Sequence, residues 1–136
     1  FGLLFSAVYL FLGRIVTSLG AANLAALGLG HRVENFAYTI CQGFSIGAAT
    51  LVGQWIGAGD KKKAMEAATN ANKMCLALMA VFSIGTVLGV NSIIGIFTSD
   101  ATITEGAIGY LVVNATVFVF MGMEAVYEGA MTGAGN

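Results

Sequence analysis

The sequence predicts an all-α membrane protein with four membrane-spanning helices, and three observations lead to this fold class. Hydrophobic residues make up 57% of the 136 residues and charged residues only 10%, whereas soluble domains carry about 25% charged residues. The apolar residues gather in four long stretches, and a helix that crosses the hydrocarbon core needs about 20 of them. The chain also has 19 glycines and no proline, which favours closely packed membrane helices.

The four apolar stretches give the expected spans, at residues 1–19, 33–57, 74–90 and 107–131. The first stretch opens directly on apolar residues, without an initiator Met or a signal peptide. We therefore expect residues 1–136 to be part of a helical bundle within a longer polytopic protein. The other helices of that polypeptide and the membrane lipid are its expected partners.

The links between the spans differ in charge. Residues 58–73, which we call the lysine loop, hold four of the six basic residues, and the link at residues 91–106 holds none. The positive-inside rule predicts that the lysine loop is cytoplasmic and the other link external, so the second and fourth spans run inward. The formal net charge is −1, which leaves no basic footprint for nucleic acid.

Glycine spacing predicts close helix packing. Four pairs are spaced as GxxxG, which lets helix backbones approach each other: Gly43/Gly47, Gly53/Gly57, Gly85/Gly89 and Gly129/Gly133. The segment Gly53–Asp60 also returns as Gly129–Asn136, and each copy ends an inward-running span. We expect a glycine to close each helix in the left-handed conformation, and Asp60 or Asn136 to cap the helix that follows.

Polar side chains mark one face of the fourth span. Helical spacing places the following on one side: Tyr110, Asn114, Val117, Met121, Glu124 and Glu128, with Tyr127 beside them. An ionised acid inside a bilayer costs at least a few kcal/mol, so we expect this face to line a cavity. Two carboxylates one turn apart repel each other, which favours a proton on one of them. Glu124 and Glu128 are therefore the expected site of a coupling proton or Na⁺. The alternatives are an interfacial Glu128 and a Glu124 that only joins helices.

The second span has a looser polar face. Its members are Glu34, Tyr38, Gln42 and Ser45. We expect the first three to line the same cavity as Tyr110, Asn114, Met121 and Tyr127, and we expect a local ion pair among His31, Arg32 and Glu34 at the outer end. His31 has no partner at metal-ligand spacing, and no nucleophile–base pair that would indicate an enzyme is present.

Two long strings resemble the multidrug and toxic compound extrusion (MATE) family: Leu24-Ala-Ala-Leu-Gly-Leu-Gly-His-Arg-Val-Glu-Asn-Phe36 and Gly43-Phe-Ser-Ile-Gly-Ala-Ala-Thr-Leu-Val-Gly-Gln-Trp-Ile-Gly-Ala-Gly-Asp60. Later segments follow in the family's order, namely Phe97-Thr-Ser-Asp100, Tyr110-Leu111 and Gly129–Asn136. The resemblance implies an inner-membrane antiporter of twelve helices in two bundles, of which this chain begins the second half. Such proteins export small organic compounds, driven by inward flow of Na⁺ or H⁺, and use no cofactor.

The resemblance also bears on the coupling acid. Some relatives carry an acid on the span that corresponds to the fourth, and alignment from the closing Gly-Ala-Gly places that position at Met121, one turn from Glu124. Two other functions stay open. One is a lipid-precursor or polysaccharide flippase of the wider superfamily, whose cavity is usually more basic. The other is a non-transporting assembly module, in which the polar face only holds helices together.

Overall fold

Three long helices make up most of the computed structural model, which describes residues 10–11, 13–15, 18, 20–97 and 101–135. They are α2 (Ala21–Gly57), α3 (Lys61–Phe97) and α4 (Ala101–Gly133). Each is long and apolar enough to cross a membrane, so the predicted all-helical membrane fold is confirmed for these three. The predicted span at residues 1–19 lies mostly outside the described residues.

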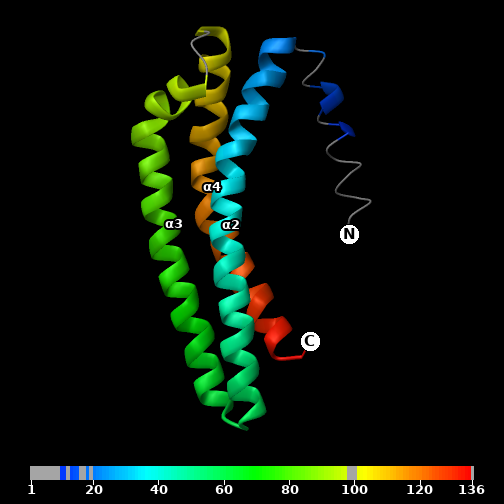
Figure 1. The fold of residues 1–136 in the computed structure, drawn as a ribbon, viewed down its shortest axis with the longest axis vertical. Helices are drawn as coiled ribbons and strands as arrows, with labels where there is room; N and C mark the ends of the chain where they lie inside the picture. Colours follow the sequence, from blue (N-terminus) through cyan, green and yellow to red (C-terminus); the bar gives the residue numbers. More distant parts are fainter. Residues whose placement is uncertain (1–9, 12, 16–17, 19, 98–100, 136) are drawn as a thin grey trace.

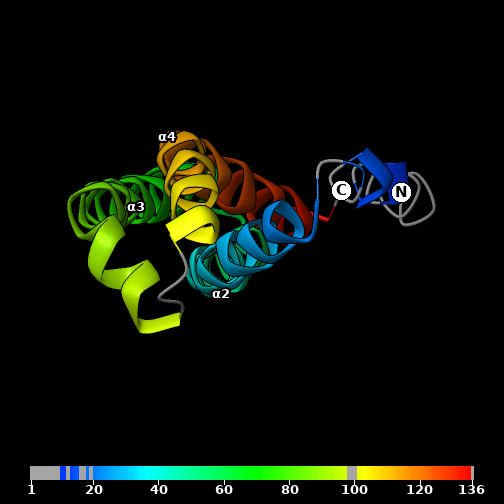
Figure 2. The ribbon, with the colours of Figure 1, turned by 90° about the horizontal axis from the view of Figure 1, so that it is seen from above.

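The three helices pack as an up-and-down bundle. Helices α2 and α4 run in the same direction and α3 runs in the opposite one (Figure 1). Seen from above, the helices occupy the corners of a triangle, and each contacts the other two (Figure 2). Because α3 returns the chain to the starting side, the second and fourth of the predicted spans become parallel neighbours.

The helices extend beyond the apolar stretches predicted to span the membrane. Helix α2 begins at Ala21 rather than at residue 33, and α3 covers 37 residues where the stretch at 74–90 was expected. At 1.5 Å per residue, α3 is about 55 Å long, against about 30 Å for the hydrocarbon core. Hydropathy marks the part of a helix that lies in hydrocarbon, not its ends. Most of the predicted lysine loop is therefore the first turns of α3.

The repeated segment closes α2 and α4 in the same way. In both, the first residue after the helix donates its N–H to the carbonyl oxygen four residues back, at 3.0 Å. The following glycine is left-handed, with φ of +77° at Gly59 and +89° at Gly135, as predicted from the repeat. Asp60 then caps α3, because its Oδ1 accepts a hydrogen bond from the Lys63 N–H at 3.0 Å. Asn136 lies outside the described residues.

One glycine pair brings two backbones into direct contact. A Cβ added to Gly129 would overlap the Ser45 carbonyl oxygen, and a Cβ added to Gly133 would overlap that of Ala49. A Cβ on Gly53 would lie 3.2 Å from the Gly133 carbonyl oxygen. Helices α2 and α4 therefore meet backbone to backbone near the ends where the repeated segments lie.

Two of the other glycine pairs do not hold the described helices together. A Cβ added to Gly43, Gly47 or Gly85 would meet no atom within 4 Å, and one on Gly89 would meet only the Ile93 side chain. The expectation of close packing was therefore wrong for Gly43/Gly47 and Gly85/Gly89, as far as α2, α3 and α4 are concerned. Spacing alone does not say which face of a helix meets a neighbour.

The bundle core has two apolar clusters. One cluster contains residues of all three helices, among them Val33, Ala37, Ile94, Leu111 and Phe118. The other is built around Cys41, Cys75, Met79 and Val126. Both cysteines are free thiols, and Cys75 donates to the Gly122 carbonyl oxygen at 3.6 Å. This packing turns the remaining faces of α2 and α4 away from α3.

Candidate functional site

The polar faces of α2 and α4 border one pocket of about 460 Å³, which we call the α2–α4 pocket. Its lining residues are His31, Glu34, Asn35, Tyr38 and Gln42 from α2, and Met121, Glu124, Ala125 and Glu128 from α4. Positions on each helix recur every three or four residues, so each helix contributes a single face. The structure thus brings together two polar faces that are about 90 residues apart in the chain.

Six of the nine candidate residues line this pocket: Glu34, Tyr38, Gln42, Met121, Glu124 and Glu128. The other three do not. Tyr110 and Asn114 lie farther toward the start of α4, and Tyr110 borders the pocket through its contacts with Glu34 and His31. The Tyr127 side chain is 50% exposed and points elsewhere. Ser45, the fourth member of the polar face of α2, is buried beneath Gly129.

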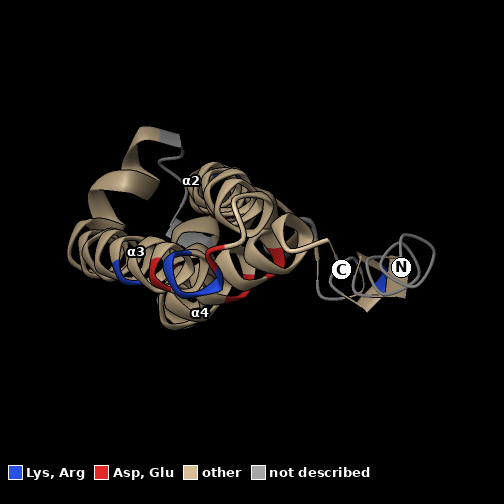
Figure 3. Cartoon of the chain, turned by 90° about the horizontal axis from the view of Figure 1, so that it is seen from below, with Lys and Arg blue, Asp and Glu red and all other residues tan. Residues whose placement is uncertain are grey.

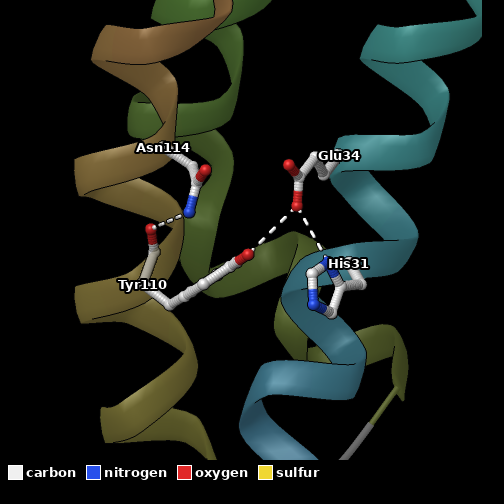
Figure 4. A network of polar contacts seen from close by, with 4 residues as sticks. All are labelled: His31, Glu34, Tyr110 and Asn114. Carbon is white, nitrogen blue, oxygen red and sulfur yellow. Dashed lines mark hydrogen bonds and ion pairs between the residues drawn. The ribbon is translucent and has the colours of Figure 1, made fainter. Parts of the chain in front are cut away.

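Glu34 accepts one hydrogen bond from its own helix and one from α4 (Figure 4). The Tyr110 hydroxyl of α4 donates to Glu34 Oε2 at 3.0 Å. His31, one turn before Glu34, places its Nδ1 2.9 Å from the same oxygen. The predicted local contact between His31 and Glu34 is confirmed, and it becomes an ion pair when the imidazole is protonated. The carboxylate of Glu34 is therefore held between α2 and α4.

A glycine sets the position of Tyr110. A Cβ on Gly30 would overlap the Tyr110 ring, so the ring lies flat against the α2 backbone where no side chain stands. The ring also meets the His31 imidazole edge-on, with 5.9 Å between centroids. Asn114 donates to the Tyr110 carbonyl oxygen at 3.1 Å, within its own helix. Sequence reasoning missed the Tyr110–Glu34 contact, for which Gly30 one turn before Glu34 is the signal.

The charge of the pocket is acidic. Three glutamates and one histidine line it, and neither Lys nor Arg is among the lining residues. Glu124 and Glu128 are exposed to the pocket and to solvent. Arg32, which also lies on α2, borders a different pocket with Phe82 and Ile93. A lining of this composition attracts cations.

A transition-metal or calcium centre is not formed by the described residues, because no three of their His, Cys, Asp or Glu side chains are grouped closely enough to hold a metal ion. The pocket therefore offers dispersed carboxylates instead of a closed ligand cage. Such carboxylates suit a proton, a monovalent ion or an organic cation, each of which needs fewer fixed ligands.

Comparison with known proteins gives consistent matches over nearly the whole chain. The MatE family model matches residues 2–136. The multidrug resistance protein NorM of Burkholderia vietnamiensis is 29% identical over 133 residues, covering 94% of this chain and 29% of that protein. The human multidrug and toxin extrusion protein 1 is 27% identical over 119 residues, covering 87% of this chain and 21% of that protein.

A probable multidrug resistance protein NorM of Thermotoga maritima is 27% identical over 132 residues, covering 97% of this chain and 28% of that protein. The chain thus spans less than a third of the length of these relatives. No solved structure gives a significant match.

Proposed function

The chain belongs to the MatE family, and on that premise we propose that it is part of an inner-membrane antiporter that exports drugs or organic metabolites in exchange for inward-flowing Na⁺ or H⁺. The family is one of multidrug and toxin efflux transporters and not of enzymes. In the proposed protein, the described helices belong to one of two bundles that surround a central cavity. Transporters built from repeats commonly bind substrate and coupling ion at such an interface.

The acidity of the α2–α4 pocket is the observation that carries this proposal. Three carboxylates within membrane helices are costly to keep unless a cavity, a partner or a bound cation offsets their charge. Glu34, Glu124 and Glu128 all line one pocket, so a cation that enters it would meet carboxylates at successive positions along the pocket. An assembly module that only holds helices together would account for Glu34, which is bonded to Tyr110 of α4, but it gives no role to Glu124 and Glu128.

The same acidity favours export of organic compounds over transport of an anionic lipid precursor. The negatively charged head of a lipid precursor needs basic side chains in the cavity. Of the two arginines, Arg14 is exposed and Arg32 borders another pocket. A cationic or amphipathic compound, in contrast, could place its charge beside the glutamates and its apolar part against Tyr38 and Met121.

Competition for these carboxylates would produce exchange. A coupling ion at Glu124 neutralises the charge that holds a cationic substrate, so binding of one weakens binding of the other. If the pocket opens alternately to the two sides, the inward gradient of the ion then drives release of the substrate outside. Glu124 is assigned the coupling role because it is the deeper of the two acids on α4, whereas Glu128 is one turn nearer the helix end.

The test is Glu124→Gln in the full-length transporter, which keeps the shape of the side chain but removes its ability to ionise. Glu105→Gln is the matched control, because Glu105 lies on the same helix, is exposed and does not line the pocket. Purified protein in liposomes is given an inward Na⁺ gradient or an inward H⁺ gradient, and export of a fluorescent organic cation is followed. We expect Glu124→Gln to bind the dye and lose gradient-driven export, with Glu105→Gln unchanged. Export by Glu124→Gln at the wild-type rate would assign this carboxylate a structural role.

A further inference from the structure

We propose that α3 carries a binding surface for the headgroups of anionic phospholipids, on a face that we call the lysine face. Its members are Lys61, Lys62, Met65, Glu66, Thr69, Asn70 and Lys73. They surround a groove of about 580 Å³ along the first three turns of the helix. The proposal rests on the placement of α3 in a membrane and not on any transport activity.

The lysine face is turned away from the rest of the bundle. Its residues recur every three to five positions, which places them on one side of α3. The opposite side of the same turns holds Ala64, Asn72 and Cys75, all buried. The members named above are exposed, and Met65 keeps 72% of its surface accessible. Helices α2 and α4 therefore leave this face open to whatever surrounds the described bundle.

The lysines of this face have no partner of their own. Lys61, Lys62 and Lys73 form no ion pair within the described chain, whereas Lys63 is paired with Asp60 at 3.4 Å and lies 4.6 Å from the centre of the Trp55 ring. With one glutamate among three lysines, the face has a formal charge of +2. Figure 3, seen from below, shows basic residues on α3 at the near end of the bundle.

Intrahelical forces do not explain why lysines occupy these positions. The N-terminus of a helix carries a partial positive charge, which disfavours cations in the first turn. Helix α3 nevertheless begins with three consecutive lysines and has no acid within that turn. A negatively charged group outside the helix would offset both the unpaired lysines and the unfavourable end of the dipole.

The position of the face along α3 fits the headgroup layer. Beyond Lys73 the exposed side of α3 is mainly apolar, with Met74, Leu78, Val81, Ile84, Leu88 and Ile96. The stretch from residue 74 to residue 96 is about 33 Å long at 1.5 Å per residue, close to the thickness of the hydrocarbon core. Lys73 then stands at the edge of the hydrocarbon, and Thr69 and Asn70 stand one turn outward, at the level of lipid phosphates.

The members of the lysine face would contact different parts of the lipid, according to their depth in the membrane. Lys73 meets the phosphate directly, while Thr69 and Asn70 offer hydrogen bonds to phosphate or glycerol oxygens. Lys61 and Lys62 lie about 16–18 Å farther from the hydrocarbon than Lys73, a distance of about two Debye lengths, so their attraction to the anionic surface is weaker. The exposed Met74 side chain borders the first part of the acyl chains. A zwitterionic headgroup lacks the net charge that this arrangement favours.

Native mass spectrometry of the full-length protein tests this proposal. The protein is extracted from vesicles that contain dioleoylphosphatidylglycerol and dioleoylphosphatidylcholine in equal amounts, and the retained molecules of each lipid are counted. We expect wild type to retain phosphatidylglycerol preferentially. Lys73→Gln should weaken its binding about fivefold, and adding Lys61→Gln and Lys62→Gln should weaken it further. Lys63→Gln is the matched control, because it removes the same charge from a side chain that is already paired.

Three results would overturn the proposal. They are equal retention of the two lipids by wild type, unchanged retention of phosphatidylglycerol by the triple variant, and an equal loss in Lys63→Gln and Lys73→Gln. The last result would mean that only total charge matters. A fourth result concerns access. If another segment of the full-length protein covers the face, Lys73 will stay unreactive toward an acylating reagent in vesicles without phosphatidylglycerol, and this would also exclude a lipid there. Raising the salt concentration should weaken retention by wild type more than by the triple variant.

Discussion

The backbone contact between α2 and α4 can be tested with a single methyl group. Gly129→Ala adds a Cβ that would overlap the carbonyl oxygen of Ser45 and lie too close to its C and Cα atoms. Because these are backbone atoms, no side-chain rotation relieves the overlap, and the two helices must move apart. Gly47→Ala is the matched control, because Gly47 lies in the middle of α2 and a Cβ there meets nothing within 4 Å.

The difference between the two variants isolates the steric term. Both replace a helical glycine by alanine, which favours the helix by about 0.5–1 kcal/mol in each case. Only Gly129→Ala also causes overpacking, which lowers the free energy of unfolding by about 1–3 kcal/mol. The two variants should therefore differ by about 1–3 kcal/mol in free energy of unfolding, which corresponds to about 5- to 150-fold in the unfolding equilibrium constant.

Unfolding of the full-length protein in mixed micelles is the assay, with the fraction of dodecyl sulfate raised and helix content followed by circular dichroism. Gly129→Ala should unfold at a lower dodecyl sulfate fraction than wild type, and Gly47→Ala at the same fraction or a higher one. Equal midpoints for the two variants would show that α2 and α4 do not touch at Gly129. That result would also refute the register between α2 and α4 on which the α2–α4 pocket depends.

Three further predictions concern other contacts. Tyr110→Phe keeps the ring beside α2 but removes the hydrogen bond to Glu34, so we expect the free energy of unfolding to fall by about 1–2 kcal/mol in the same assay. An unchanged midpoint would show that this bond is not formed in the folded protein. Asp60→Ala removes the cap of α3 and should cost about 1 kcal/mol, again read from the midpoint, while Asp60→Asn should cost much less. Single cysteines at Lys62→Cys and Thr102→Cys should react with a membrane-impermeant maleimide from the cytoplasmic and the external side respectively, and labelling of both cysteines from the same side would contradict the proposed topology.

Local features were predictable from the sequence because neighbouring residues determine them. The left-handed glycines at the ends of α2 and α4 follow from the repeated segment, and the Asp60 cap follows from its place directly before a helix. The polar face of α4 follows from helical periodicity. The existence of each helix follows from its apolar length, since about 20 apolar residues form a helix in a bilayer whatever they pack against.

Features that depend on the relative placement of helices were not predictable. The four glycine pairs look alike in sequence, yet only Gly129/Gly133 faces another backbone at both positions. Tyr110 and Glu34 are 76 residues apart, and their contact requires a specific register between α2 and α4. The ends of α3 were missed because its first turns are polar, and hydropathy reports only the segment that hydrocarbon surrounds.

The repeated segments lie at one end of the contact between α2 and α4. Because α2 and α4 are parallel and end in the same turn, the two copies lie near each other, and Gly53 of the first copy faces Gly133 of the second. At the other end of the contact, Gly30 faces Tyr110. Facing residues are offset by 80 positions in both pairs, so the two contacts share one register.

The parallel helices are held together at both ends of their contact. One close contact lies at the glycines of the repeat and the other at Gly30. Between them lie the larger polar side chains Tyr38, Gln42 and Glu124, which line the α2–α4 pocket. Small residues at the two contacts and large polar residues between them therefore explain how two parallel helices touch firmly and still enclose an acidic pocket.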